Sequence, residues 1–392
     1  MSIRIRSSRG FKFKLVWLVA IAASLAIGFA GFPVGSAGAA RGHRKLVSVK
    51  QARAAIKSYS KVPKFVPPGP RIDTAKLKGK TVMVVSFDQA DPALAAISQA
   101  IQEAGHVAGI HVEVLDGHTT PTAVDQDLQQ AANQHVAAVI LDGVATNFIP
   151  TGLRVLKVAH IPVVGAIDGQ PTRNVKGQGG GTMLFGEASG TYAEDGRLMA
   201  DTAIVTAGKA PIRAVEETFD NPVATAAMHG LNSVLKSCKR CKVTTVQTIT
   251  PGQWSTKVAP TTAAAINATP NVNYVFAIVD SMAIYATSGV NSANKSASVK
   301  VVSSDGSGSG PLSLVKSGGP FIADPGFSDS WVGWLALDQA MRAMSGMKPG
   351  NPVVPVRYLA KSNLKKISNL NSQATLFGVA YVKGFERLWG VK

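Results

Sequence analysis

Eight short apolar runs, each followed by a stretch with helical spacing, constrain the fold of this chain more than any other sequence feature. The runs are TVMVVS, GIHVEVL, VAAVIL, IPVVGAI, IRAVEE, CKVTTVQTI, NYVFAIV and VKVVS. Continuous rather than alternating hydrophobicity is typical of strands that are covered on both faces. Strand followed by helix, repeated along the chain, predicts parallel sheets in a doubly wound α/β fold. Eight strands also permit a closed (β/α)8 barrel, which stays open as the alternative.

Aspartates follow several of these runs directly. In a parallel sheet all strands point the same way, so these residues gather at one edge, where open α/β sheets bind ligands. The aspartates at strand ends are Asp88, Asp91, Asp142, Asp168, Asp280 and Asp305. An aspartate in this position can instead cap the next helix by accepting from its free N–H groups. Asp91 and Asp142 are the candidates for capping alone, because DP and DG dipeptides commonly start turns.

The first 39 residues have the three parts of a secretory signal peptide. A basic stretch precedes an apolar run over residues 15–32, and Ala37-Gly38-Ala39 offers a cleavage site with small residues. The apolar run is also long enough to be an uncleaved membrane anchor, which remains the alternative. In either case the rest of the chain is expected to work outside the cytoplasm.

Residues 40–78 are expected to be a basic extension that precedes the folded core. They contain a helix-like piece, VKQARAAIKSYS, and then FVPPGP, whose prolines favour an extended linker lying on the domain. The formal net charge of the chain is +18. The lysines are scattered and only 6% of residues are aromatic, so we expect a basic surface facing an anionic envelope rather than a nucleic-acid partner.

The only two cysteines are Cys238 and Cys241, in LKSCKRCKV. They lie between a helix-like stretch and a strand-like run, so they are expected at a helix C-terminus, whereas thioredoxin-like chemistry uses a helix start. In an exported chain this favours a small structural disulfide. A redox-active pair or half of a metal site is the alternative. The sequence offers no second cysteine pair and no histidine at ligand spacing, so no metal is expected.

Enzyme motifs are missing from the sequence. There is no GxxxxGK[ST], GxSxG or HExxH, and the glycine clusters GQGGG and DGSGSG do not have nucleotide-binding spacing, so no cofactor is expected. A pair of carboxylates could hydrolyse sugars as in glycosidases, and this alternative stays open. Hydrogen-bond acceptors placed around a bound polar molecule explain the same residues more simply.

From Gly79 to about Ala360 the chain resembles the periplasmic binding proteins of the ribose-binding type, the solute receptors of ABC importers. The resemblance rests on the order of several segments, among them VVSFDQADPALAAISQAIQEAG, IPVVGAID, NYVFAIVDSMAIYA, VKVVSSDG and FIADPGFSDSWVGWLALDQAM. It implies two α/β lobes joined by three crossing segments, with the ligand between them. Lobe 1 would be residues 79–184 and 325–354, and lobe 2 residues 185–323 and 355–392 with a C-terminal tail. The crossings would fall near GTMLFGE, IADPG and VPVRY.

The resemblance also implies roles for individual residues. Asp168, Asp280 and Asp305 match positions that accept from ligand hydroxyls, and Trp254 matches an aromatic ring against the ligand. The alternative for Trp254 is a hydrophobic staple before a helix capped by Ser255. Weaker candidates for the site are Phe87, Asp324 and Phe327.

The chain departs from the family pattern in three places. Ala93 and Leu94 in the first loop stand where sugar receptors commonly carry aromatic residues, Ala227 stands near the arginine that clamps sugar hydroxyls, and Val279 replaces an asparagine. Bidentate arginine recognition is therefore missing from its expected place.

Taken together, the sequence predicts an extracytoplasmic receptor that captures a small polar ligand, similar to a sugar or polyol. It would deliver this ligand to an ABC permease in the membrane, as a monomer and without covalent chemistry. A sensor partner that presents ligand to a membrane receptor, or a carboxylate-dependent sugar hydrolase, are the alternatives.

Overall fold

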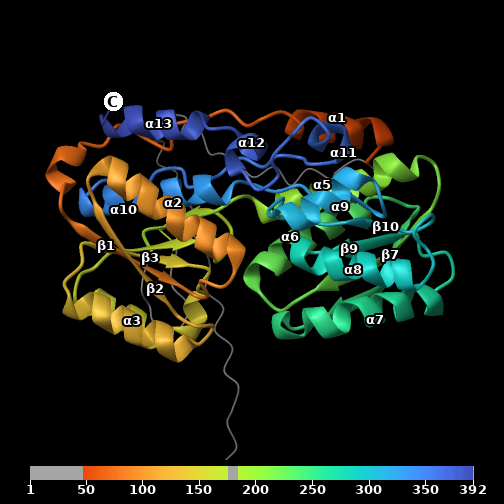
Figure 1. Cartoon of the computed structure of the whole chain (residues 1–392), viewed down its shortest axis with the longest axis horizontal. Coiled ribbons are helices and arrows are strands. Elements are labelled where there is room, and N and C mark those ends of the chain that lie inside the picture. Colours follow the sequence, from red (N-terminus) through yellow and green to blue (C-terminus); the bar gives the residue numbers. More distant parts are fainter. Residues whose placement is uncertain (1–46, 175–183, 392) are drawn as a thin grey trace, which may run out of the picture. The chain divides into compact units, whose positions relative to one another are not determined.

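The computed structural model describes residues 47–174 and 184–391. The predicted signal peptide lies outside these residues. Two separate open sheets form the framework of the chain (Figure 1). This confirms the predicted doubly wound α/β class and rules out the single closed barrel. Over the described ranges, no helix is both long and apolar enough to cross a membrane.

The first sheet has the strand order β2-β1-β3-β4-β6-β5. Its strands are β1 (Thr81–Ser86), β2 (His111–Asp116), β3 (Ala138–Asp142), β4 (Val163–Ala166), β5 (Thr172–Arg173) and β6 (Gly186–Ala188). All are parallel to their neighbours except β5, which is antiparallel to β6. β3 and β4 are buried along their whole length, as their continuous hydrophobicity predicted, whereas β2 is partly exposed at the sheet edge.

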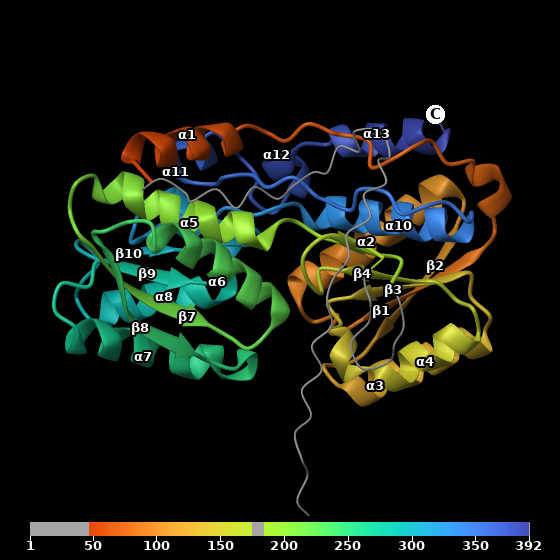
Figure 2. The same ribbon diagram turned by 180° about the vertical axis from the view of Figure 1, so that it is seen from behind.

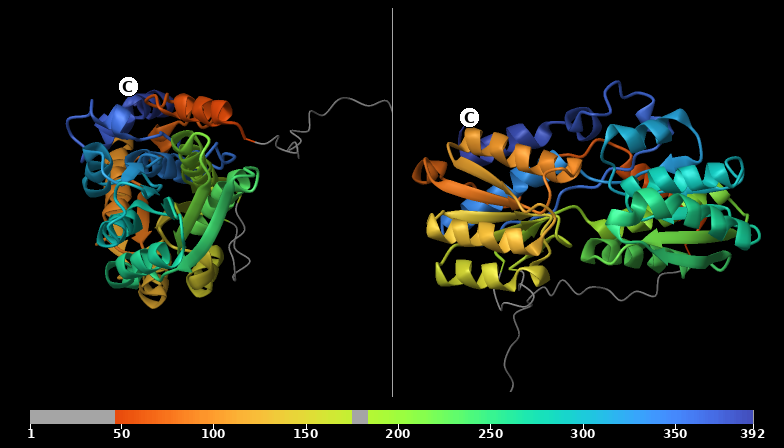
Figure 3. Two further views of the ribbon diagram at one scale, coloured as in Figure 1. Left: turned by 90° about the vertical axis from the view of Figure 1, so that its right-hand side faces the viewer. Right: turned by 60° about the horizontal axis from the view of Figure 1, so that its bottom comes forward.

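Helices cover both faces of the first sheet, as Figure 3 shows. On one face α10 lies against α2 and contacts β3, β4 and β6, while α3 and α4 pack together on the other. The helices are α2 (Pro92–Ala108), α3 (Pro121–Asn133), α4 (Pro150–Val158) and α10 (Asp329–Met344), with the short 3-10 turns η1 (Thr74–Leu77) and η2 (Thr146–Phe148).

The second sheet is wholly parallel and has the order β11-β10-β9-β7-β8. Its strands are β7 (Ile212–Thr218), β8 (Cys241–Thr248), β9 (Tyr274–Ala277), β10 (Lys300–Val302) and β11 (Phe321–Ala323). Helix α5 packs on α6 and helix α7 packs on α8 (Figure 2). These helices, with α9, are α5 (Tyr192–Ala207), α6 (Pro222–Leu235), α7 (Trp254–Ala268), α8 (Asp280–Ser292) and α9 (Ser309–Ser317); the turn η3 (Pro251–Gln253) precedes α7.

The chain passes between the two sheets in three places, and the first differs from the prediction. Strand β6 pairs with β4, so the first sheet includes Gly186–Ala188 and the chain leaves it at residues 189–191 rather than at GTMLFGE. The second passage runs from β11 to α10 and the third follows α10. Gly326 in the second pairs with Arg357 in the third through a two-way backbone bridge. The crossings are thus tied together by backbone hydrogen bonds.

The N-terminal extension is more than a linker lying on the surface. Helix α1 (Val49–Tyr59) begins with a capping box between Ser48 and Gln51 and packs along α5 (Figure 2). Ile72 and Leu77, further along, are fully or almost fully buried. The extension therefore belongs to the folded core, because its apolar side chains have their burial partners there.

The C-terminal end returns to the helices of the first sheet. The chain forms α11 (Lys361–Leu364) and α12 (Gln373–Phe377), and then α13 (Ala380–Trp389) packs on α10 and α2. Trp389 stacks on Trp334 of α10 with ring centroids 5.3 Å apart. Assigning all of residues 355–392 to the second lobe is therefore wrong for α13, whose apolar face is buried on the first.

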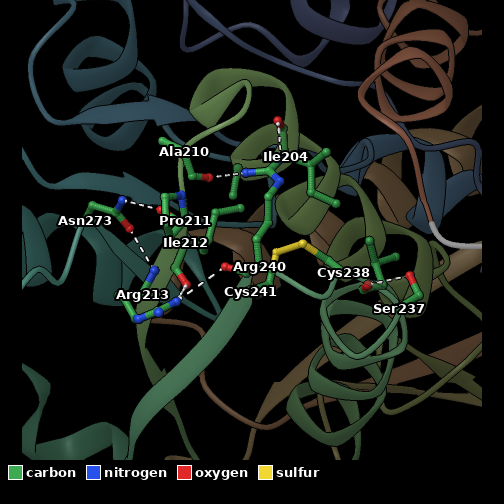
Figure 4. The surroundings of a disulfide bond; sticks show 12 residues. Ile204, Ala210, Pro211, Ile212, Arg213, Ser237, Cys238, Arg240, Cys241 and Asn273 are labelled. Atoms are coloured by element: carbon green, nitrogen blue, oxygen red, sulfur yellow. Dashed lines mark hydrogen bonds between the residues drawn. A yellow bond between two sulfur atoms is a disulfide. The ribbon is translucent and has the colours of Figure 1, made fainter.

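Cys238 and Cys241 form the predicted disulfide just after the end of α6 (Figure 4). Cys241 is also the first residue of β8. Between the cysteines, Arg240 donates to the backbone oxygens of Ala210 and Ile204, which ties this turn to the end of α5 (Figure 4). The bond thus lies within a turn held by side-chain contacts, consistent with a structural role.

Candidate functional site

The loop after β1 holds three of the predicted site residues. Asp88 accepts from the backbone N–H of Ala90 at 2.9 Å, and Phe87 is half-buried. Asp91 is the N-cap of α2 and accepts from the N–H groups of Ala93 and Leu94. Its capping role is therefore confirmed. The cap leaves the charge of Asp91 in place, where it acts on other acids.

Asp142 does not cap a helix, contrary to the prediction. It ends β3, is fully buried, and accepts from the Ser98 hydroxyl of α2 at 2.8 Å. The next helical turn, η2, begins four residues later with Ala145 at its N-cap. Burial raises the pKa of Asp142 well above its usual value, and the Asp91 charge raises it further. The hydrogen bond from Ser98 of α2, and not the DG turn, therefore determines the environment of this carboxyl.

Asp168 and Glu187 form a pair of acids at the ends of β4 and β6. The backbone N–H of Asp168 donates to Oε1 of Glu187 at 2.7 Å. Glu187 also fills the space above Gly165, where a Cβ would collide with its carboxylate. Burial raises the pKa of Glu187 to about 8, and burial with the Glu187 charge raises that of Asp168. Sequence reasoning missed Glu187, because GTMLFGE was interpreted as a crossing and not as a strand.

Asp280 and Asp305 lie at the carboxyl ends of β9 and β10. Asp280 is the first residue of α8 and accepts from the backbone N–H and the hydroxyl of Ser307 at 3.1 and 3.2 Å. Asp305 has a positive φ of 105°, and its N–H donates to the Pro325 oxygen of the second crossing. A Cβ on Gly326 would collide with the Asp305 backbone, so this close approach requires a glycine.

Asp324 lies in the second crossing and is fully buried. Within the described residues neither of its carboxylate oxygens has a hydrogen-bond partner at normal geometry. The backbone N–H of Gly306 is near enough to lower its pKa, but burial and the charges of Asp280 and Asp305 prevail and raise it well above its usual value. An acid this deep without a partner is costly in a folded protein.

Two acids that the sequence analysis missed complete this cluster. Asp195, in the first turn of α5, is fully buried and both of its oxygens lack a partner among the described residues. Asp329, the first residue of α10, accepts from the Gln373 amide at 3.1 Å. Neither follows a strand of the predicted set, which is why the strand-end pattern did not reveal them. We call the five residues the acid group: Asp195, Asp280, Asp305, Asp324 and Asp329.

Members of the acid group raise one another's pKa values. After burial, the largest effect on Asp280, Asp195 and Asp329 is the charge of Asp305. Burial, followed by the Asp91 charge, raises the pKa of Asp305 to about 7. No lysine or arginine is among the groups that shift these pKa values. Among the described residues the group is therefore a cluster of buried carboxyls whose ionisation is disfavoured and that no basic side chain stabilises.

The charge of Asp91 acts on acids that belong to both sheets. It raises the pKa of Asp142 at the end of β3, and also that of Asp305 and Asp329. Because such effects fall off with distance, the loop after β1 lies near acids of both sheets. The structure therefore brings together most of the strand-end aspartates.

The predicted aromatic residues have different surroundings. Trp254 is half-buried, donates its indole N–H to the Ile249 oxygen at 2.9 Å, and meets Phe219 edge-to-face at 5.2 Å. Ser255 is not a cap, because α7 begins at Trp254 itself. Phe327 is buried against Tyr192 and above Gly190, so it packs the crossings instead of facing a ligand.

Ala227, the position where an arginine was expected, lies in the contact between α6 and α5. A Cβ on Gly196 of α5 would collide with the Ala227 backbone oxygen. Ala227 itself is buried, so a long side chain has no room there. Across residues 47–174 and 184–391, no three His, Cys, Asp or Glu side chains are arranged to hold a metal ion.

No family model matches the chain, and no curated protein sequence matches it either. Solved structures do. A Caulobacter myo-inositol binding protein bound to myo-inositol has a TM-score of 0.63 and 22% identity, covering 77% of this chain and 98% of its own. An ABC transporter periplasmic solute binding protein from Actinobacillus succinogenes with bound D-allose has a TM-score of 0.64 and 17% identity, covering 73% and 99%.

A third match is an ABC transporter solute binding protein from Mycobacterium smegmatis with bound glycerol. It has a TM-score of 0.64 and 18% identity, and the match covers 74% of this chain and 97% of the other. The chain thus has the type I periplasmic binding protein fold that the resemblance predicted. At these identities the likeness concerns the fold, and the site has to be argued from the residues of this chain.

Proposed function

We propose that this chain is an extracytoplasmic solute-binding receptor that holds a small polar ligand, similar to a sugar or polyol, at the facing strand ends of its two sheets. It would deliver the ligand to an ABC permease in the membrane. The ligand-binding residues in this proposal are Asp168, Asp280, Asp305 and Asp324, with Trp254 against an apolar face and Phe87, Asp88 and Asp91 in the flanking loop.

One observation carries the proposal: three buried carboxylates lack a hydrogen-bond partner of normal geometry among the described residues. They are Asp168 and Asp324, which follow strands, and Asp195 in the first turn of α5. Buried polar atoms in proteins are nearly always bonded, so such oxygens indicate a missing donor. A bound molecule with several hydrogen-bond donors supplies it, and open α/β sheets bind ligands at this edge.

Related folds support the class of function. The solved structures with this fold include solute binding proteins of ABC transporters, with myo-inositol, D-allose or glycerol bound. The predicted signal peptide fits a receptor outside the cytoplasm. Neither the sensor alternative nor the hydrolase alternative is favoured by a specific feature of the described residues.

Native mass spectrometry of the purified chain tests the proposal. We expect one small molecule bound per monomer, released unchanged on unfolding. A glycoside panel incubated with the protein should give no hydrolysis products. Turnover of any glycoside, or a chain that carries no molecule and binds none from a sugar and polyol library, would refute the receptor proposal.

A further inference from the structure

We infer that the ligand carries at least one protonated amine, as in an amino sugar or an aminocyclitol, and that its ammonium group lies against Asp195, Asp280 and Asp324. This inference rests on the proposed receptor function and narrows its ligand class.

The first argument is the state of the two deepest carboxylates. Asp195 and Asp324 are both 0% exposed, and all their oxygens lack a hydrogen-bond partner among the described residues. An isolated carboxylate in such a place is strongly destabilised unless it is paired or protonated. A cation between them is the partner that would satisfy both.

The second argument is that no basic side chain among the described residues is ion-paired with the acid group. The backbone of Arg357 pairs with Gly326 beside Asp305. Its guanidinium donates to the backbone oxygen of Leu376, and its buried Nε has no partner among the described residues. The four salt bridges found among the described residues include no member of the acid group. The position is therefore open to a cation from outside the chain.

The third argument is the match of donors and acceptors. A hydroxyl group both donates and accepts, so a neutral polyol needs donors from the protein as well as acceptors. Among the described residues, the donors bonded to side chains of the acid group are the Ser307 hydroxyl and N–H, used by Asp280, and the Gln373 amide, used by Asp329. An ammonium group has three donors and accepts nothing, while ionised carboxylates only accept. Charge-assisted hydrogen bonds of this kind are also the stronger ones.

The acid group is faced by few other titratable side chains. Asp91, Asp142 and Glu194 are the other acids that act on it, and Tyr192 lies beside Asp305, Asp195 and Asp329. All of these are acidic. Each carboxyl that ionises when a cation enters strengthens its binding, so affinity for an amine should rise between pH 5 and pH 7, where the ammonium group of the ligand stays protonated.

Calorimetry with matched pairs of probes tests the inference. The pairs are D-glucosamine with D-glucose, D-galactosamine with D-galactose, and 2-deoxystreptamine with myo-inositol, and N-acetyl-D-glucosamine serves as the uncharged control. We expect the aminated member of at least one pair to bind ten or more times tighter, and acetylation to remove the gain. Its affinity should rise with pH, while that of a neutral probe stays flat.

A variant localises the effect. Asp324→Asn should lower amine affinity at least tenfold, which is about 1.4 kcal/mol. Asp73→Asn is the matched control: it removes the same charge from an exposed N-cap, and asparagine caps equally well. It should bind like the parent.

The outcomes separate the inference from the function on which it rests. If neutral members bind as tightly as the aminated ones, or if native mass spectrometry finds a bound molecule without a basic nitrogen, the amine inference is wrong and the receptor function stands. If Asp73→Asn weakens amine binding as much as Asp324→Asn does, the placement of the ammonium group is wrong. If no probe binds and no molecule is carried, the receptor function itself fails.

Discussion

Asp338 and Asp324 are both fully buried, yet their surroundings are opposite. Asp338, on α10, accepts from the Arg342 guanidinium at 2.7 and 3.3 Å and from the Trp389 indole at 2.9 Å. Asp324, five residues before the first residue of α10, accepts from no described residue at normal geometry. Other residues supply hydrogen-bond donors to Asp338, whereas no described residue supplies one to Asp324 at normal geometry. The first is a feature of stability, and the second points to a ligand.

The surroundings of Asp338 belong to a region where distant parts of the chain are joined. Arg342 also donates to the Pro70 oxygen, and the N–H of Ile72 donates to the Leu388 oxygen of α13. Phe65 packs on Trp331 and Phe385, with ring centroids 6.1 and 5.0 Å apart. The N-terminal extension, α10 and α13 thus form one packed and hydrogen-bonded layer, which we call the strap. Asp338 and Arg342 of the strap are paired with each other, whereas Asp195 and Asp324 of the acid group have no partner of normal geometry among the described residues.

Arg342→Met tests the buried ion pair of the strap and should have the largest effect on stability. It leaves Asp338 buried beside a methionine, and removing one partner of a buried ion pair typically costs about 3–5 kcal/mol. Denaturant unfolding measures this loss. Lys348→Met removes the same charge from an exposed position beyond α10 and should change stability by less than about 0.5 kcal/mol. Equal effects of the two variants would mean that the buried pair contributes nothing specific.

Asp324→Asn tests the other side of the comparison, and its effects on stability and binding should have opposite signs. Without ligand the variant should be as stable as the parent or more so, because it removes an uncompensated buried acid. Ligand affinity should fall by the contribution of a charged hydrogen bond, about 1.5–3 kcal/mol. Thermal unfolding with and without ligand measures both. A variant that is destabilised and still binds normally would make Asp324 a structural residue.

The pH dependence of stability sharpens the same contrast. Burial raises the pKa of Glu187 and Glu217 to about 8 and that of Asp305 to about 7, whereas these groups ionise near pH 4 in an unfolded chain. Between these values the folded state holds more protons, so its stability is greatest at low pH and is lost as the pH rises from about 4 to 8.

Each titrating group contributes a slope on the order of 1.4 kcal/mol per pH unit over its own range. Unfolding of the ligand-free chain at pH 5 and pH 8 measures the loss. Glu187→Gln should reduce the dependence of the unfolding free energy on pH, because it removes one of the titrating groups. Stability that increases towards pH 8 would show that these carboxyls are compensated in the folded chain.

Phe65→Ala tests whether the strap depends on its aromatic contacts. Phe65 is half-buried. The loss of stability should therefore be smaller than the roughly 3–5 kcal/mol that is typical when a fully buried phenylalanine is replaced by alanine. The neighbouring Val66→Ala, at a side chain 70% exposed, is the control and should be nearly neutral. Ligand affinity should be unchanged in both. If Phe65→Ala costs no more than Val66→Ala, the extension adds no stability through this ring.

Replacing both Cys238 and Cys241 with serine should have the smallest effect. Only two residues separate the cysteines, so the entropic gain is expected to lie below the roughly 3 kcal/mol estimated for a fifteen-residue loop. Thermal unfolding should show a modest loss of stability in this variant. The parent protein should show the same loss when its disulfide is reduced. Calorimetry should show the parent affinity. A selective loss of binding in the double-serine variant would contradict the structural role of the bond.

Local patterns in the sequence were enough to predict eight of the described strands, the fold class, helix α1 and the disulfide. The eight apolar runs all became strands, because continuous hydrophobicity, β-branched residues and the helical stretches between them favour the same structure. Strands β5, β6 and β11 were missed, since two or three residues carry too little periodicity to be recognised.

The sequence alone could not say which acids would remain without partners. Asp91 and Asp142 both follow strands in turn-forming dipeptides, yet Asp91 caps α2 and Asp142 is buried against Ser98 of that helix. The strand-end pattern did not identify Glu187, Asp195 and Asp329, although each is buried near other acids. Sequence position fixes which side chains reach an edge of a sheet. Whether a carboxyl there finds a donor depends on segments far away in the chain, such as Arg342 and Trp389 for Asp338, and only the packed structure brings those together.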